Sequence, residues 1–135
     1  MRPSLEEMAS EYRPFWVAAA AGELRFPRCD DCGKFHWYPM KVCPHCQSDR
    51  IDWKKISGQG SLYSWTTVRR AFVREFEAKL PYVVGLIEFP EAPGVRLISN
   101  LVDIANAEQI AFGAPMVPVF DKMVDERSTL AFKPK

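Results

Sequence analysis

The residues with the clearest chemistry are four cysteines, all that the chain contains, in two Cys-x-x-Cys pairs. Cys29 and Cys32 make the first pair, and Cys43 and Cys46 make the second. Four thiolates at this spacing can surround one zinc ion tetrahedrally, whereas two disulfides or four free thiols are the alternatives. No secretory pattern supports disulfides, so the spacing predicts a metal site. Such a site has no coordination position for a substrate, which predicts a structural zinc, with iron as the alternative metal.

The only two histidines, His36 and His45, lie in the same part of the chain. Either could replace a cysteine as a ligand, but with four cysteines available each is expected at the surface or in a turn. Nucleophilic catalysis needs an activated side chain beside an oriented base. Because the cysteines are assigned to a metal, the sequence predicts no catalytic residues of its own.

Length and composition indicate a globular protein that holds one ordinary domain, or a metal module joined to a domain of roughly 80 residues. The chain has 135 residues, of which 47% are apolar and 26% charged, and its formal net charge is +1. A nucleic-acid-binding protein normally carries a strong basic excess, which this chain lacks. No apolar run is long enough to cross a membrane, and the cytoplasm is expected.

Residues 1–23 are predicted to form an N-terminal helical segment. Pro14 suits the first turn of a helix that runs from Phe15 to Ala21 and stops at Gly22. Phe15 and Trp16 leave this helix with few polar side chains, so it must pack against its own domains or against a partner subunit.

Residues 24–56 are predicted to form a ribbon clipped by the metal. Strands are expected at Leu24–Arg28 and Ile51–Ile56, on either side of the two cysteine pairs. A returning strand is expected at Phe35–Pro39, where Pro39 would end it.

Residues 57–135 are predicted to form a mainly β domain after a linker at Ser57–Gly60. Five short strands, with a helical turn at Ala105–Gln109 between the third and the fourth, have the order of a five-stranded OB-fold barrel, and a five-stranded sandwich is the alternative. The strands are expected at Ser61–Val68, Pro81–Phe89, Val95–Val102, Met116–Phe120 and Ser128–Phe132.

The connection between the first two of these strands contains Phe72, Phe76 and Leu80, spaced four residues apart. On a helical turn the three side chains would share one face. This apolar edge either caps the core of the barrel or acts as a lid or partner-docking element.

Taken together, these motifs resemble the DUF35 family over residues 12–132. The run from Phe15 to Gly33 and the segment Pro39–Cys46 are similar to the rubredoxin-like zinc ribbon of that family. The segment Gly58–Thr66, followed by Pro81-Tyr82-Val83, is similar to the start of its acyl-CoA-associated OB-fold.

The resemblance implies a function that the residues alone do not. DUF35 proteins accompany thiolase-superfamily enzymes that act on acyl-CoA thioesters, as in β-oxidation. The chain would be a non-catalytic accessory subunit that binds a thiolase, acyltransferase or aldolase, stabilises it and helps shape its CoA or acyl channel. The partner would supply the catalytic residues. The alternatives are a single-stranded nucleic-acid-binding module and a free-standing acyl-CoA-binding protein.

Within this interpretation, basic side chains would meet the phosphates of acyl-CoA and an aromatic ring could stack on its adenine. The candidate acyl-CoA contacts are Arg69 and Arg70 after the first barrel strand, and Lys34, Trp37 and Tyr38, with Lys41, on the ribbon. The candidate partner interface consists of Phe15, Trp16, Phe72, Phe76 and Leu80.

Overall fold

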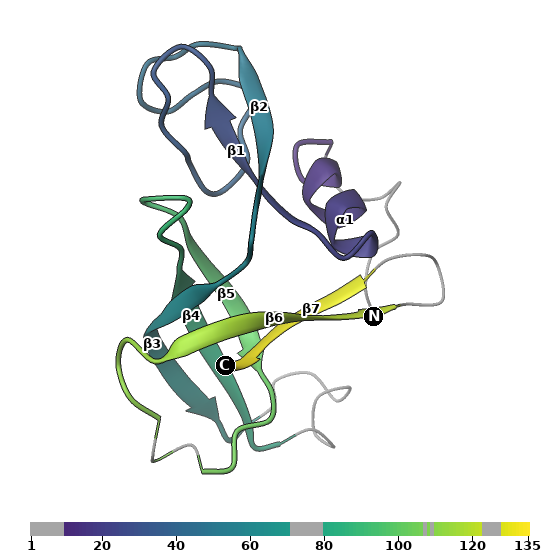
Figure 1. Ribbon diagram of the computed structural model, residues 1–135, viewed down its shortest axis with the longest axis vertical. Coiled ribbons are helices and arrows are strands. Elements are labelled where there is room, and N and C mark those ends of the chain that lie inside the picture. The colour runs from purple at the N-terminus through teal and green to yellow at the C-terminus, as the bar shows by residue number, and fades with distance from the viewer. Residues whose placement is uncertain (1–9, 71–79, 107, 109, 123–127) are drawn as a thin grey trace.

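The structure is a computed structural model, and it describes residues 10–70, 80–106, 108, 110–122 and 128–135. A small ribbon sheet with one helix beside it stands over a β-barrel (Figure 1). The elements in chain order are α1 (Arg13–Ala20), β1 (Leu24–Cys29), β2 (Ile51–Ile56), β3 (Gly60–Val68), β4 (Tyr82–Glu88), β5 (Arg96–Leu101), β6 (Pro115–Lys122) and β7 (Ser128–Pro134).

The predicted N-terminal helix is present as α1, and it packs on its own chain. Pro14 lies in the first turn, and the helix ends where Gly22 takes a positive φ of 76° and donates its N–H to the Ala19 carbonyl. Phe15, Ala18 and Ala19 are buried. The apolar face of α1 is therefore used within the molecule, whereas Val17 on another face is 53% exposed.

The ribbon is a two-stranded antiparallel sheet of β1 and β2, in register from Leu24 opposite Ile56 to Cys29 opposite Ile51. The third strand predicted at Phe35–Pro39 is wrong, because this segment makes only one isolated bridge, between Phe35 and Arg28. Its aromatic and apolar side chains are instead used for burial beneath the cysteine loops: His36 and Pro39 are buried and Trp37 is half-buried. The aromatic composition of this segment thus gave a strand-like pattern although its residues are not paired in a sheet.

The five remaining strands form a closed barrel in the order β3-β4-β5-β7-β6, with β6 returning to β3. Every pairing is antiparallel except that of β5 with β7. This order confirms the predicted OB-fold and excludes the sandwich. In β5, Leu97, Ser99 and Leu101 are buried while Arg96 and Ile98 are exposed, which is the alternation of a strand with one face on the core. The helical turn predicted at Ala105–Gln109 lies partly outside the described residues.

Ribbon and barrel share one aromatic core. The ring centre of Phe26 on β1 lies 5.1 Å from that of Phe89, which follows β4. The ring centre of Phe89 lies 5.8 Å from that of Phe132 on β7. Phe26 and Phe132 are fully buried. Burial of a phenylalanine side chain contributes about 1.5–3 kcal/mol. The ribbon is therefore packed on the barrel and is not a free-standing module.

The predicted linker between ribbon and barrel is close-packed. Ser57 donates its backbone N–H to the Glu91 carboxylate, at 3.1 and 3.3 Å, across to the β4–β5 turn. A Cβ on Gly58 would lie 2.7 Å from Cγ of Pro118, and Gly58 also has a positive φ of 89°. The glycine is required by this close approach and by its backbone conformation.

No helix in the described residues is long and apolar enough to cross a membrane. The cytoplasmic location expected from the sequence stays a prediction.

The shared core gives a first prediction. The substitution Phe26→Ala should lower the free energy of unfolding by about 3–5 kcal/mol, because it leaves a cavity between ribbon and barrel. Denaturant titration of the metal-loaded protein measures the loss. Val17→Ala on exposed α1 surface is the control and should change the value by less than about 0.5 kcal/mol. A loss below about 1 kcal/mol for Phe26→Ala would mean that the shared core contributes little.

Candidate metal centre and aromatic cavity

The two cysteine pairs sit in loops with the same backbone geometry. In the first loop Gly33 donates its N–H to the Cys29 carbonyl at 2.9 Å, and Cys29 donates to Lys34 at 3.0 Å. In the second loop Gln47 donates to the Cys43 carbonyl at 2.8 Å and Cys43 donates to Ser48 at 2.7 Å. Gly33 and Gln47 occupy equivalent positions and have positive φ values of 74° and 65°. The glycine was expected, whereas a left-handed glutamine has no clear signal in the sequence.

These loops bring the four cysteine sulfurs within 4.8 Å of one another. The Sγ atoms of Cys29 and Cys46 are 3.5 Å apart, and those of Cys32 and Cys43 are 3.7 Å apart. A disulfide needs about 2.05 Å, which excludes the disulfide alternative. Zinc–sulfur bonds of about 2.3 Å in a tetrahedron place the sulfurs about 3.8 Å apart. The sulfur positions therefore fit one tetrahedral metal ion.

The electrostatics of the sulfurs also favour a cation among them. The pKa of the Cys29 thiol is lowered to about 7. The backbone N–H of Cys32 lowers it most, desolvation opposes this, and the N–H of Asp31 lowers it further. The backbone N–H of Ser48 lowers the pKa of Cys46, but the surrounding sulfurs and desolvation raise it to about 12. Because thiolates repel one another at this range, all four can ionise together only around a metal ion.

Neither histidine belongs to the cluster of metal-ligating side chains found among the described residues. His45 is exposed, as expected, and its Nε2 donates to the Phe35 carbonyl at 3.3 Å. The expected surface position of His36 is wrong, since this side chain is only 4% exposed. Its backbone N–H donates to the Pro27 carbonyl at 3.1 Å, which holds the residue against β1.

An ion pair ties the two cysteine loops together. Arg50 Nε donates to the Asp31 carboxylate at 3.2 Å, and its second guanidinium contact with Asp31 is closer still. Ser48 also donates its hydroxyl to Asp31. Arg50 and then Ser48 lower the pKa of Asp31 to about 2. The pair therefore stabilises the ribbon above about pH 4, and this contribution is lost as the pH falls toward 2.

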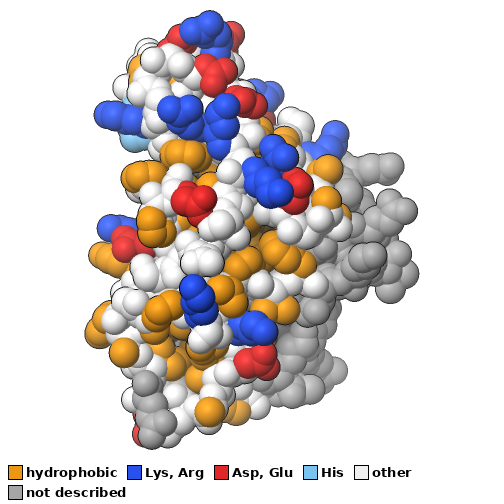
Figure 2. Space-filling view, viewed as in Figure 1, with side chains coloured by type: hydrophobic (Ala, Val, Ile, Leu, Met, Phe, Trp, Pro, Cys, Tyr) orange, Lys and Arg blue, Asp and Glu red, His pale blue; other side chains and the backbone are white. Residues whose placement is uncertain are grey.

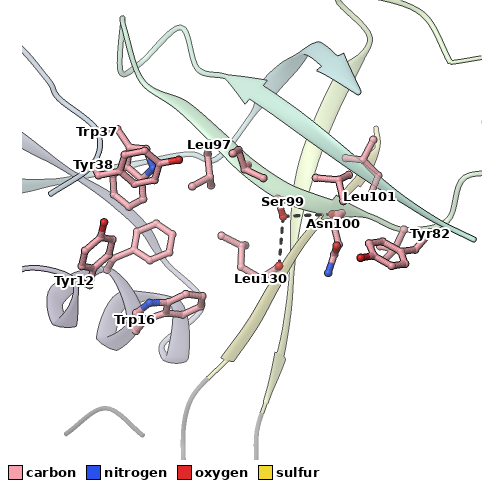
Figure 3. A pocket seen from close by; sticks show the side chains of 14 residues that line it. Tyr12, Trp16, Trp37, Tyr38, Tyr82, Leu97, Ser99, Asn100, Leu101 and Leu130 are labelled. Atoms are coloured by element: carbon pink, nitrogen blue, oxygen red, sulfur yellow. Dashed lines mark hydrogen bonds between the residues drawn. The ribbon is translucent and has the colours of Figure 1, made fainter. Parts of the chain in front are cut away.

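A cavity of about 620 Å³ lies where α1, the ribbon and the barrel meet. Figure 3 shows aromatic side chains of the N-terminal segment and the ribbon along one wall and strand residues along the other. Its volume is in the range of small-molecule pockets. The lining residues include Tyr12, Phe15, Trp16, Trp37, Tyr38, Tyr82, Leu97, Ile98, Ser99, Asn100 and Leu130.

No charged side chain lines this cavity among the described residues, and its polar groups are few. The hydroxyl of Ser99 donates to the carbonyls of Asn100 and Leu130, at 3.3 and 3.4 Å. The indole N–H of Trp37 is buried without a hydrogen-bond partner in the described structure. Tyr38 and Ile98 are 54% and 58% exposed at the cavity. The cavity thus suits an uncharged, apolar occupant.

The structure brings some predicted residues together and separates others. Four side chains predicted for two different roles line this one cavity: Phe15 and Trp16 for a partner, Trp37 and Tyr38 for acyl-CoA. Trp37 also lines a second cavity, together with Lys34.

The remaining predicted residues lie elsewhere. Arg69 and Arg70 are exposed and follow β3 at the end away from the ribbon, so the two predicted acyl-CoA clusters are not adjacent (Figure 1). Leu80 is half-buried, while Phe72 and Phe76 lie outside the described residues.

Sequence reasoning missed Tyr12 and the β5 residues of the cavity. The only available signal was the pair Ser99 and Asn100 beside the apolar residues of β5, which does not identify a cavity on its own.

Comparison with known proteins matches both parts of the chain. Residues 16–52 match the family model described as the rubredoxin-like zinc ribbon domain of ChsH2, and residues 53–121 match its C-terminal OB-fold domain. Among solved structures, a chain of the Ltp2–ChsH2(DUF35) aldolase is similar over 98% of both chains, with 31% identity and a TM-score of 0.83. A DUF35 protein of unknown function from Sulfolobus solfataricus shares the fold, with 17% identity, a TM-score of 0.63 and coverage of 96% of this chain and 89% of that one.

Curated relatives include DUF35 domain-containing scaffold proteins and a thiolase subunit. The scaffold protein of Methanocaldococcus jannaschii is 30% identical over 73% of this chain and 68% of its own, and that of Pyrococcus furiosus is 34% identical over 73% and 62%. The benzoylsuccinyl-CoA thiolase subunit BbsA of Thauera aromatica is 31% identical over 58% of this chain and 51% of its own.

The sulfur geometry predicts which variants lose the metal. Cys43→Ser should lower zinc below about one equivalent per chain and destabilise the ribbon, because structural zinc binding contributes directly to folding. His45→Ala is the control and should keep one equivalent. Metal analysis measures both, and an absorption spectrum identifies iron if it is present. Zinc loss in His45→Ala with retention in Cys43→Ser would refute the four-cysteine assignment.

The Asp31–Arg50 pair gives a prediction on pH. Acidification protonates the thiolates and releases the metal, and Arg50→Gln removes the contact that holds the two cysteine loops together. We expect half of the zinc to leave at a pH higher by about half a unit than in the wild type. A zinc-sensitive dye follows the release. Lys54→Gln, which removes an exposed pair with Asp52, should release zinc as the wild type does. Equal release curves for all three proteins would refute the prediction.

Proposed function

We propose that this chain is the accessory subunit of a thiolase-like enzyme that acts on acyl-CoA thioesters. The basis is that the chain belongs to the DUF35 family, with a ChsH2-type zinc ribbon followed by a ChsH2-type OB-fold. The observation that carries the proposal is the match over 98% of the chain, at a TM-score of 0.83, with a chain of the Ltp2–ChsH2(DUF35) aldolase. The relative named as a subunit of benzoylsuccinyl-CoA thiolase adds support from a second complex.

The arrangement of reactive side chains supports a non-catalytic role for this subunit. All four cysteines are gathered in one cluster, whose tetrahedral geometry leaves no open position on the metal. His36 is buried without a hydrogen-bond partner in the described structure, and His45 is exposed with its Nε2 on a backbone carbonyl. Neither histidine has the paired nucleophile and orienting group that nucleophilic catalysis requires. The partner enzyme therefore supplies the catalytic residues.

The ribbon contributes one structural zinc. Its two strands are too small to fold independently, since an isolated two-stranded sheet is marginally stable at best in water. The metal fixes the two cysteine loops, and the loops and α1 bury Trp37 beside Phe15, with ring centres 5.0 Å apart. Zinc thereby supports one wall of the aromatic cavity without taking part in chemistry.

The aromatic cavity is the part of this subunit that faces the acyl channel of the partner. An acyl chain is uncharged and apolar, as are most of the side chains that line the cavity. The exposed side chains of Tyr38 and Ile98 extend the cavity to the surface, where a partner could cover them.

The proposal predicts that the purified chain is inactive alone. Co-expression with the thiolase-like protein encoded beside it should give a stable hetero-oligomer that is active on an acyl-CoA. Size-exclusion chromatography with light scattering measures the complex, and chromatography of the acyl-CoA substrate and its products measures the activity. If the chain stayed monomeric and formed no complex with any thiolase-like protein encoded beside it, the proposal would be refuted.

The cavity is tested separately. Ile98→Glu should weaken the complex by about tenfold or more, because a carboxylate would be buried in an apolar interface. Ala111→Glu adds the same charge at an exposed position in the β5–β6 connection and should leave the affinity within twofold. Equal affinities for the two variants would place the interface away from this cavity.

A further inference from the structure

The barrel side of the aromatic cavity contains an open strand edge. β5 pairs with β4 at all six of its residues, but with β7 only at Asn100 and Leu101. Toward the beginning of β5 the two strands diverge, and the cavity lies in this gap, with Ile98 and Leu130 among its lining residues. Figure 3 shows the Ser99 hydroxyl bonded to the Leu130 carbonyl where the gap begins. The first half of β5 therefore has one edge on β4 and another that faces the cavity.

The strand pairing shows which backbone groups lie on this open edge. In an antiparallel pair, residues whose N–H and C=O face the neighbouring strand alternate with residues whose groups face away from it. Val102, directly after β5, donates its N–H to the Phe132 carbonyl of β7 at 2.8 Å. By this alternation Ile98 also turns its N–H and C=O away from β4, whereas Leu97 and Ser99 turn theirs toward β4. Within the described residues, the register of β5 with β7 gives Ile98 no partner on the open side.

The surroundings of the open edge are apolar. The side chain of Ile98 is 58% exposed, and no described residue that lines the cavity is charged. Arg96, at the start of β5, is held in an ion pair with Glu88 of β4. Lys and Arg side chains gather mainly on the upper part of the molecule, over the ribbon and α1 (Figure 2). Charged side chains are one means by which proteins keep other strands away from an open edge. The cavity lining provides none at Ile98, so the edge is available to another strand.

We propose that an extended segment of the partner enzyme pairs with β5 at Ile98 and adds one strand to the sheet of β3, β4 and β5. This inference rests on the proposed accessory role, and it specifies how the partner covers the exposed side of the cavity. The N–H and C=O of Ile98 bind the C=O and N–H of the segment. A helix could not take this place, because its backbone groups are bonded within the helix.

The cavity also determines the side chains of the segment. Successive side chains of a strand point to opposite faces, so every second one is directed toward the cavity. These side chains are uncharged, since a charge buried among the lining residues would have no partner. The segment lies at the Ile98 side of the cavity, and the aromatic wall with Phe15 and Trp37 is left for the acyl channel.

Hydrogen exchange, measured by mass spectrometry at single-residue resolution, tests the pairing. In the isolated zinc-loaded chain the amide of Ile98 should exchange at least about tenfold faster than those of Leu97 and Ser99, because only the latter two face β4. In the complex with the co-expressed thiolase-like partner, the Ile98 amide should slow by about tenfold or more. The exposed amide of Ala111 is the control and should not change. An unchanged Ile98 rate in a stable complex would refute the added strand and leave the accessory role intact. Absence of any complex by light scattering would refute both.

A backbone substitution separates pairing from burial alone. Semisynthesis that replaces Ile98 by its α-hydroxy acid keeps the side chain and removes the N–H. This change should weaken the complex by about fivefold, the effect of one hydrogen bond. The same replacement at Ala111 should leave the affinity within about twofold. Zinc content and thermal midpoint show that both proteins are folded. Equal affinities of the two esters would mean that the partner covers Ile98 without pairing, which would overturn the proposal.

Discussion

The contact on which the rest of the structure depends is the packing of Phe26 against the barrel. Phe26 belongs to the ribbon, yet its ring packs against three others. The distances between ring centres are 6.0 Å to Phe15 of α1, 5.3 Å to Trp37 and 5.1 Å to Phe89. A two-stranded ribbon has too little core to be stable on its own, and a metal clip fixes its loops without orienting it. Burial of this one ring gives helix, ribbon and barrel a common core. Both cavities exist because these three parts hold fixed positions relative to one another.

Trp37 divides the two cavities, and their chemistry differs on its two sides. One cavity is apolar and uncharged, whereas basic side chains such as Arg28 and Lys34 line the other. Trp37 lies between the two cysteine pairs in the chain, so the positions of the cysteine loops help to determine the shape of both cavities. In the proposed accessory role, the chain would act through the positions of its surfaces. The catalytic groups would then belong to the proposed partner enzyme.

Much of the fold could be predicted because its signals are local. The cysteine spacing gave the metal cluster, and Pro14 and Gly22 bracketed the helix. Alternating and β-branched runs gave the order of the barrel strands. The predictions failed where tertiary contacts decide burial. His36 is buried, and the aromatic segment Phe35–Pro39 makes only one isolated bridge. The cavities were not predictable, because Tyr12, Trp37 and Ser99 are far apart in sequence. The division of the chain after residue 56 stays a prediction, although β2 ends at Ile56.

The junction at Gly58 has a consequence for how such proteins diverge. A Cβ on Gly58 would lie 2.7 Å from Pro118. Gly58, in the connection between ribbon and barrel, therefore packs closely against Pro118 on the barrel strand β6. The Glu91 carboxylate, which accepts the Ser57 N–H, is a second fitted pair across the same junction. Exchange of ribbons between relatives by recombination would separate these pairs. A chimaera that keeps this junction packed must therefore carry the matching residues on both sides.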